Sequence, residues 1–163
     1  MYIVLWNTLQ YTSLNISQAR QQNEKIMIIA LDHIAIAVPE LQTAIARFAE
    51  DFGLNFAGTE AVESAQTMTA FFPIQGTQIE LIHPLDGKGP VQTSLEKRGP
   101  GLHHICFRTD DIQADMQKLK DKGYRFLSEG PTAGAHGSLV AFIHPKSAGG
   151  VLIELAEHPH HEP

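Results

Sequence analysis

Apolar and polar side chains alternate along residues 31–38 and again along residues 102–108. A period of two residues predicts a half-buried β-strand in each stretch. His33 lies on the face of the first strand that its large apolar side chains do not occupy, and His104 takes the matching place in the second strand. After each strand the apolar spacing becomes helical. The pattern therefore predicts two strands that are each followed by a helix.

The two predicted helices have start and stop signals at matching places. Pro39 is expected in the first turn of the first helix, and Gly53 ends it. Asp110 or Asp111 is expected to cap the second helix, which ends at Gly123. Three strands are expected to follow each helix, at about 54–60, 66–73 and 77–82 in the first unit and near 124–128, 138–143 and 150–156 in the second.

The two units also resemble each other in sequence. Residues 31–36 (LDHIAI) correspond to residues 102–107 (LHHICF), and residues 78–81 (QIEL) correspond to residues 152–155 (LIEL). His33 and His104 are 71 positions apart (104 minus 33), and Glu80 and Glu154 are 74 positions apart (154 minus 80). Because nearly one offset relates both pairs, we infer that an ancestral module was duplicated.

The repeat divides the chain into segments. Residues 1–29 match neither unit and are expected to form a peripheral leader. Met27 lies just before the first unit, so one interpretation is that translation naturally begins there; a weak organelle presequence is the alternative. The expected segments are a leader at 1–29, a first module at 30–84, a linker rich in Gly, Pro and charge at 85–101, a second module at 102–157 and a polar tail at 158–163.

Composition limits the classes of function. With 163 residues and 43% hydrophobic side chains, the chain is long enough to bury one core. Its formal net charge of -6 argues against nucleic acid or an anionic membrane as the main partner. The single cysteine, Cys106, excludes an internal disulfide and a thiolate metal cluster. No apolar run reaches the roughly 20 residues of a membrane span, and we expect a cytoplasmic protein.

The duplicated His and Glu residues predict a metal site. If the first and last strands of each module lie side by side, His33 and Glu80 share one face, as do His104 and Glu154. Pairing the modules about a pseudo-twofold axis then brings all four side chains to one centre. Imidazole nitrogens and carboxylate oxygens suit a divalent ion such as Mn, Co, Ni, Zn or Fe(II). A cation would also compensate the cost of burying two carboxylates.

Several stretches resemble the vicinal oxygen chelate superfamily and, within it, the methylmalonyl-CoA epimerases. The opening strand at residues 31–39 and the second opening strand at 101–105 are similar to those of the family. The most specific stretch is residues 144–155 (HPKSAGGVLIEL), with Gly-Ala-His-Gly at 134–137 before it. The resemblance covers about residues 31–157 and implies an α+β fold in which two βαβββ modules form a cupped mixed sheet around a metal.

The resemblance also implies an activity, the interconversion of the (R) and (S) epimers of methylmalonyl-CoA through an enolate formed by removal of the C2 proton. Glu154 matches a carboxylate that is both a metal ligand and a base. Glu80 matches a position that is Gln in some relatives and Glu in others. Some relatives carry a further Glu where this chain has Thr69, which leaves Glu80, Glu63 or a metal-bound water as the second proton carrier.

Other residues are weaker candidates. Lys146, in a Gly-rich loop, is expected to contact a CoA phosphate or the substrate carboxylate. Cys106 is expected to be a small core thiol that faces the cup. Lys88, Lys97 and Arg98 are further candidate contacts in the linker; His103, His136 and His144 are expected to form hydrogen bonds or line the cavity; and His158, His160 and His161 are expected to be disordered.

Three alternatives stay open at this point. A lyase of the glyoxalase I type, acting on a glutathione hemithioacetal, would use the same ligand set. An extradiol-type dioxygenase would need Fe(II) and commonly two His with one carboxylate, so a fourth ligand argues mildly against it. A metal-free binding protein of the same fold is the third. The family likeness further suggests a homodimer.

Overall fold

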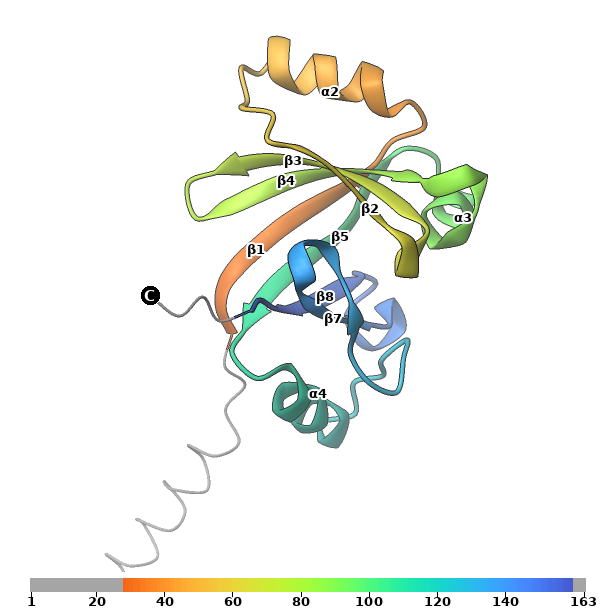
Figure 1. Cartoon of the computed structure of the whole chain (residues 1–163). Coiled ribbons are helices and arrows are strands. Elements are labelled where there is room, and N and C mark those ends of the chain that lie inside the picture. The colour runs from red at the N-terminus through yellow and green to blue at the C-terminus, as the bar shows by residue number, and fades with distance from the viewer. Residues whose placement is uncertain (1–27, 160–163) are drawn as a thin grey trace, which may run out of the picture.

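The computed structural model describes residues 28–159. Within this range the backbone forms one curved sheet with helices outside it and at one end (Figure 1). The strands are β1 (Ile28–Ala37), β2 (Gly58–Val62), β3 (Thr67–Ile74), β4 (Thr77–Pro84), β5 (Gly101–Thr109), β6 (Thr132–Ala133), β7 (Leu139–Ile143) and β8 (Ile153–Glu157). The helices are α2 (Leu41–Glu50), α3 (Gly89–Arg98) and α4 (Ile112–Asp121).

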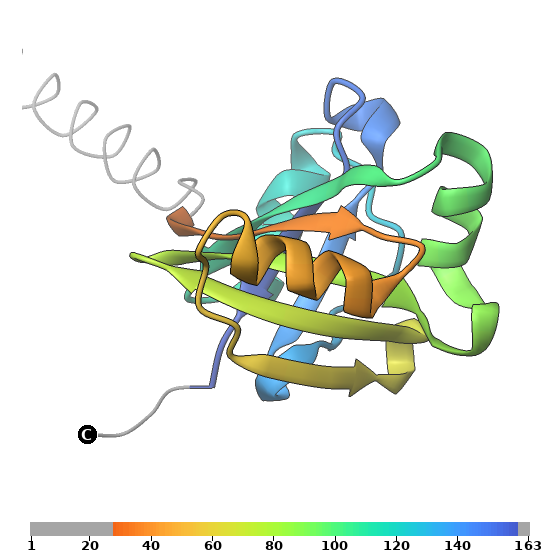
Figure 2. The same ribbon diagram turned by 90° about the horizontal axis from the view of Figure 1, so that it is seen from above.

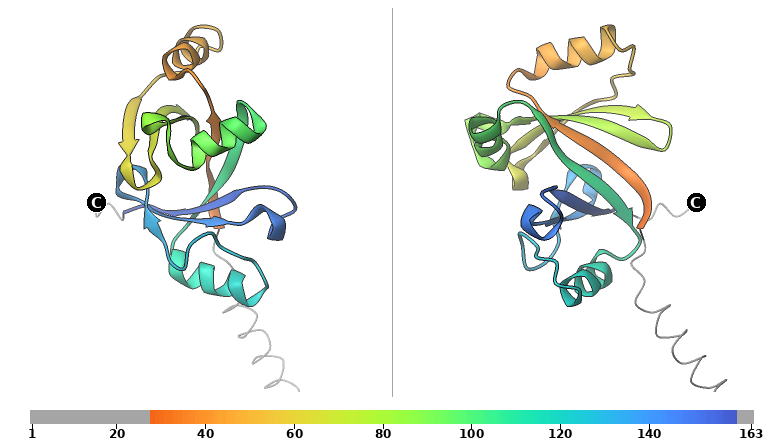
Figure 3. Two further views of the ribbon diagram at one scale, coloured as in Figure 1. Left: turned by 90° about the vertical axis from the view of Figure 1, so that its right-hand side faces the viewer. Right: turned by 180° about the vertical axis from the view of Figure 1, so that it is seen from behind.

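The sheet is built from two similar halves. Its strand order is β2-β3-β4-β1-β5-β8-β7-β6. In each half the first strand pairs in parallel with the last, β1 with β4 and β5 with β8. The halves join through β1 and β5, which run antiparallel and lie side by side in both views of Figure 3. The two modules therefore pair within one chain, and the expected α+β fold with a mixed sheet is confirmed.

Each half has its own apolar core on the outer side of the sheet. In Figure 1, α2 covers the outer side of the first half and α4 that of the second, and Figure 2 shows α2 lying across its strands. The α2 core contains the fully buried Phe72 and Leu81, and the α4 core contains Ile112 and Leu155. Because the helices cover the outer faces, the inner faces of both halves remain for polar side chains.

The structure confirms one of the predicted capping residues of the second helix, but one of the predicted strands does not form. Asp111 is the N-cap of α4, and its carboxylate accepts a hydrogen bond from the backbone N–H of Ala114. The prediction of a strand near 124–128 is wrong, because this stretch makes only a single β-bridge, between Phe126 and Ile143. Phe126 packs into the α4 core instead, and the edge strand of this half is the short β6.

The segment expected as a linker, residues 85–101, contains the helix α3. Pro90 stands in the first turn of this helix, where its missing N–H costs no hydrogen bond. Val91 is buried against Ala37 and Ile82 on the inner face of the sheet, and Leu95 packs beside it. The helix therefore closes one end of the cup as well as connecting the two modules.

The ends of the described range differ from the expected segments. β1 begins at Ile28, so two residues that were expected in the leader belong to the sheet. The proposed start at Met27 and the tail residues His160 and His161 lie outside the described residues. Among residues 28–159, no helix combines the length and the apolar character that crossing a membrane requires.

Gly134, beside β6, occupies a place with no room for a side chain. A Cβ atom there would lie 2.6 Å from both Ser138 Oγ and Val140 Cγ1, whereas at Gly130 it would meet nothing within 4 Å. We expect Gly134→Ala to destabilise the protein by about 1–3 kcal/mol because of overpacking. Urea denaturation of this variant beside Gly130→Ala checks the prediction, and equal midpoints for the two variants would contradict it.

Candidate active site

The registers of the two parallel strand pairs place the predicted site residues at equivalent positions. Glu80 lies opposite Ala35 on β1, two residues beyond His33. Glu154 lies opposite Cys106 on β5, two residues beyond His104. Side chains two residues apart on a strand share a face. The duplicated registers thus direct all four side chains to the inner face of the sheet, where all four are buried.

His33, His104 and Glu154 converge on one point. His33 Nε2 lies 3.1 Å from His104 Nε2 and 3.1 Å from Glu154 Oε2, and His104 Nε2 lies 2.8 Å from the same carboxylate oxygen. Ligand atoms held at about 2.0–2.2 Å from one ion are roughly 3.3–3.6 Å apart in a tetrahedron and roughly 2.8–3.1 Å apart at the right angles of an octahedron. Two facing imidazole nitrogens beside a buried carboxylate oxygen therefore fit a divalent cation by chemistry and spacing.

Glu80 stands beside this group rather than in it. Its Oε1 lies 3.4 Å from Nδ1 of His33, the nitrogen that points away from Glu154, and Gln78 donates a hydrogen bond of 2.9 Å to the same oxygen. The two carboxylates thus flank the His33 ring at its two nitrogens. The groups of potential ligand atoms that lie within 4.8 Å of one another in the described residues include Glu154 but not Glu80.

The two carboxyls differ in proton affinity. Burial raises the pKa of Glu80 to about 7, although the nearby His33 ring acts in the opposite direction. Burial also acts to raise the pKa of Glu154, but hydrogen bonds from His104 and His33 outweigh it and lower that pKa to about 2. Near neutral pH, Glu154 is ionised, while Glu80 can hold or release a proton. Two neighbouring carboxyls whose pKa values are moved apart in this way are typical of a catalytic acid and base.

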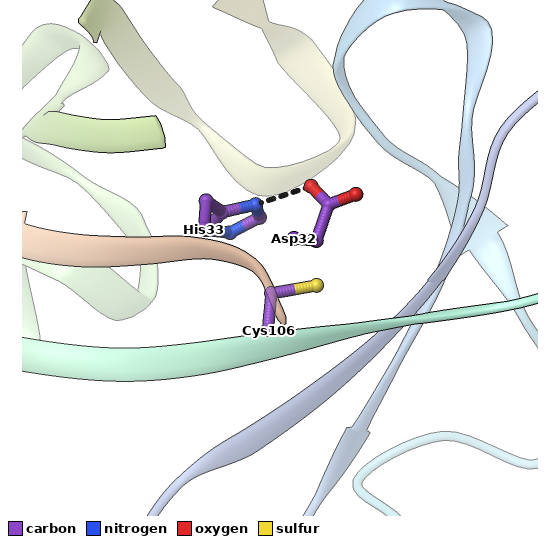
Figure 4. A group of neighbouring side chains, drawn as sticks. All are labelled: Asp32, His33 and Cys106. Atoms are coloured by element: carbon purple, nitrogen blue, oxygen red, sulfur yellow. Dashed lines mark hydrogen bonds and ion pairs between the residues drawn. The ribbon is translucent and has the colours of Figure 1, made fainter. Parts of the chain in front are cut away.

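Asp32 is a site residue that the sequence reasoning missed. Its carboxylate is buried, and Oδ1 accepts a hydrogen bond of 3.0 Å from His33 Nδ1 (Figure 4). Arg108 Nε and His158 Nε2 each lie 2.8 Å from the other oxygen, Oδ2. Burial opposes ionisation of Asp32, but these three hydrogen bonds outweigh it and lower its pKa. His158, expected in a disordered tail, is thus held at the site.

Cys106 lies on the inner face next to His33, as Figure 4 shows. Asp32, His33 and Cys106 form a second group of potential ligand atoms that lie within 4.8 Å of one another. Because both oxygens of Asp32 already accept hydrogen bonds, this carboxylate supports His33 instead of offering a free ligand atom. Burial raises the pKa of the Cys106 thiol, so the thiol is unreactive, in line with the expected core role.

A cavity of about 180 Å³ opens beside His104 and Glu154. His103 and Thr69 add polar groups to its wall, and most of the remaining surface is apolar. Burial lowers the pKa of His103 to about 4, so this ring is neutral. The apolar part of the wall includes Ile82, Val91, Leu127, Val140 and Phe142. An apolar pocket with a few convergent polar groups is the usual form of a small-molecule site.

Comparisons with known proteins agree with this site. A family model described as the Glyoxalase/Bleomycin resistance protein/Dioxygenase superfamily matches residues 32–142. The chain is 40% identical over 133 residues to the ethylmalonyl-CoA/methylmalonyl-CoA epimerase of Cereibacter sphaeroides, which covers 80% of this chain and 99% of that protein. It is 40% identical over 128 residues to the mitochondrial methylmalonyl-CoA epimerase of Homo sapiens, covering 78% and 73% respectively. The chain belongs to the methylmalonyl-CoA epimerase family.

Solved structures of family members share the fold. The methylmalonyl-CoA epimerase of Mycobacterium tuberculosis matches with a TM-score of 0.79 and 35% identity, over 83% of this chain and 92% of that one. A methylmalonyl-CoA epimerase in complex with methylmalonyl-CoA and NH4+ matches with a TM-score of 0.77 and 34% identity, over 80% of this chain and 95% of that one. The expected superfamily and its epimerase branch are thereby confirmed.

The weaker candidates of this epimerase-family chain lie outside the metal group. Lys146 is exposed on the turn between β7 and β8 and does not line the cavity. Glu63 is exposed on the turn after β2. Lys88, Lys97 and Arg98 are exposed at the two ends of α3.

The three histidines expected to form hydrogen bonds or line the cavity do so. His103 hydrogen-bonds His104 and lines the cavity. His136 Nδ1 lies 2.9 Å from a carboxylate oxygen of Glu60 on β2, and this contact links the two edges of the cup. His144 accepts a hydrogen bond from a backbone N–H of its own turn.

Proposed function

We propose that the protein interconverts the (R) and (S) epimers of methylmalonyl-CoA by proton transfer at C2. The observation that carries this proposal is the pair of buried carboxyls, Glu80 and Glu154, which flank one imidazole and have pKa values of about 7 and about 2. The names of the relatives support the substrate: several are methylmalonyl-CoA epimerases, and one structure was solved with methylmalonyl-CoA.

We further propose that His33, His104 and Glu154 hold a divalent metal ion, and that Glu80, which lies beside this group, joins as a fourth ligand only when its carboxyl is ionised. Co, Mn, Ni, Zn and Fe all suit such a set of nitrogen and oxygen donors. When bound, the cation supplies a Lewis acid that stabilises negative charge on the substrate oxygens as the C2 proton leaves.

The protein's own residues account for the proton transfers. The C2 hydrogen lies between a thioester and a carboxylate. The thioester carbonyl takes up the negative charge as an enolate when the proton leaves, whereas the ionised carboxylate alone does not ease that loss. Glu154, ionised and bordering the cavity, removes this proton as the general base. Glu80, which can hold a proton near neutral pH, returns one from the opposite side. The apolar cavity wall limits water at the reacting carbon.

The cavity next to Glu154 is proposed to bind the acyl part of the substrate. A volume of about 180 Å³ suits a small branched acid, and the Cereibacter sphaeroides relative is also named for ethylmalonyl-CoA. CoA then extends to the surface, where the exposed Lys146 is proposed to contact one of its phosphates.

A homodimer in the cytoplasm completes the proposal. Ile28, Ile29 and Leu31 on β1 are exposed apolar side chains within the described residues, and a second copy would cover them. The single free cysteine, Cys106, is compatible with a reducing compartment. Light scattering of the purified protein is expected to give twice the mass of the chain.

The test of the function is inversion of a single epimer. Purified protein is incubated with (S)-methylmalonyl-CoA, and formation of the (R) epimer is followed with and without a strong chelator. We expect inversion, its loss on chelation and its return when a divalent metal is added back. Absence of inversion in the metal-loaded protein would overturn the proposal. A parallel assay with methylglyoxal and glutathione tests the glyoxalase-type alternative, for which we expect no activity.

A further inference from the structure

Each histidine of the metal group contacts the residue that precedes it in the chain. Asp32 Oδ1 lies 3.0 Å from His33 Nδ1, and His103 Nδ1 lies 2.8 Å from His104 Nδ1. Consecutive side chains of a regular strand point to opposite faces of the sheet, which would separate both pairs. A local distortion must therefore be present in β1 and in β5.

The distortion in β1 is a bulge at Asp32. Leu31 pairs with Phe107 on β5. The next pair joins His33 to Cys106, so β1 advances two residues where β5 advances one. Asp32 is the extra residue, without a partner of its own across the strand pair. Bulges of this kind redirect side chains and are frequent next to active sites.

The distortion in β5 is the counterpart of the first. Ala35 pairs with His104, and the next pair joins Ile36 to Leu102. Here β5 advances two residues where β1 advances one, so His103 is the extra residue. The duplicated modules thus carry matched bulges, and each bulge brings the preceding side chain to the nitrogen that points away from the metal group.

The hydrogen bonds decide which nitrogen of each ring is free for a metal. A neutral histidine that offers Nε2 to a cation carries its proton on Nδ1, and this N–H needs an acceptor. For His33 the acceptor is the carboxylate of Asp32; for His104 it is the ring nitrogen of His103. The same duplicated position therefore provides an anionic partner in one module and a neutral partner in the other.

Asp32 is itself held in place from two directions. Arg108 on β5 and His158, just after β8, bind its second oxygen at 2.8 Å each. Asp32 is 2% exposed, so these contacts compensate a charge that lies almost out of water. The carboxylate is left with one defined orientation toward His33.

We propose that Asp32 and His103 are positioning residues that turn Nε2 of His33 and Nε2 of His104 toward Glu154, and that they make the two ligands unequal. The anionic partner makes His33 the stronger electron donor, and the neutral partner leaves His104 the weaker one. The inference rests on the metal site of the proposed function, but it does not depend on the reaction or the substrate.

The test measures metal binding without substrate. Co²⁺ affinity is determined by competition with a chelating dye, and the visible absorption of bound Co²⁺ reports ligand geometry. We expect Asp32→Ala to weaken Co²⁺ binding about 10–100-fold and to alter the Co²⁺ spectrum. Asp32→Asn is expected to lose less, because its amide oxygen still accepts the His33 N–H. His103→Ala is expected to lose affinity, and His103→Asn to recover part of it.

Asp115→Asn is the matched control, because Asp115 is a buried aspartate on α4 that hydrogen-bonds Thr109 and Lys118 outside the cup. We expect it to lower the unfolding temperature without changing Co²⁺ affinity. Folded Asp32→Ala and His103→Ala variants with wild-type Co²⁺ affinity and spectrum would overturn the inference, as would a wild type that binds no divalent metal. A wild-type protein that binds Co²⁺ but inverts neither epimer would contradict the proposed function and leave the inference about Asp32 and His103 standing.

Discussion

Replacing Glu154 with Gln is expected to lower kcat for epimerisation by about 10³-fold or more. The amide keeps the volume of the side chain but cannot take a proton, and general base catalysis alone contributes about 10²–10⁴-fold. The same change also weakens the metal group, since the carboxylate lies within 3.1 Å of both His33 Nε2 and His104 Nε2. Steady-state kinetics at saturating methylmalonyl-CoA and metal measure the loss.

The control for this variant is Glu157→Gln on the same strand. Glu157 accepts a hydrogen bond from the backbone N–H of Ile112 at the start of α4, and a glutamine oxygen can still accept it. We expect Glu157→Gln to retain wild-type kcat. Retention of at least a tenth of wild-type kcat by Glu154→Gln would contradict its role as the base.

Replacing Glu80 with Gln is expected to lower kcat by about 10²–10⁴-fold, with a smaller change in metal affinity than Glu154→Gln causes. The carboxyl of Glu80 has a pKa of about 7, which suits a group that gives up and takes back a proton near neutral pH. Glu80 Oε1 lies 3.4 Å from His33 Nδ1, beside the metal group, so the Glu80→Gln variant is expected to lose mainly the proton transfer and only a small part of the metal affinity. The measurements are kcat and Co²⁺ affinity on the same preparation.

Glu63→Gln is the informative comparison, because Glu63 is the other glutamate considered for the second proton. Glu63 is exposed on the turn after β2, and we expect the Glu63→Gln variant to have the same kcat as the wild type. The reverse result, full activity in Glu80→Gln and a large loss in Glu63→Gln, would transfer the role to Glu63.

The fold and the centre of the site could be predicted because the duplicated pattern repeats the same local rules. Alternation along two strands places His33 and His104 on the inner face, and parallel pairing within each module brings Glu80 and Glu154 to that face. A half-buried strand leaves such a pattern in the sequence, because the large apolar side chains must lie on its other face.

The features that were not predicted depend on departures from those rules. Asp32 and His103 approach the ligand histidines only because β1 and β5 are bulged, and strict alternation would place them on the outer face. Helix α3 is stabilised by contacts of Val91 with the inner sheet rather than by its own composition, which is rich in Gly and Pro at the start. Glu80 lies beside the metal group because of its contacts with His33 and Gln78, and its strand register alone does not predict that position.

Deuterium uptake at C2 tests most directly whether two carboxyls serve the two faces of the substrate. Each epimer is incubated separately in D₂O with wild-type protein and with Glu80→Gln, and both deuterium at C2 and epimer composition are followed. For the wild type we predict inversion of either epimer with deuterium in the product. For Glu80→Gln we predict that one epimer takes up deuterium far faster than it inverts. Equal rates of uptake and inversion in Glu80→Gln, at the wild-type level, would contradict the account.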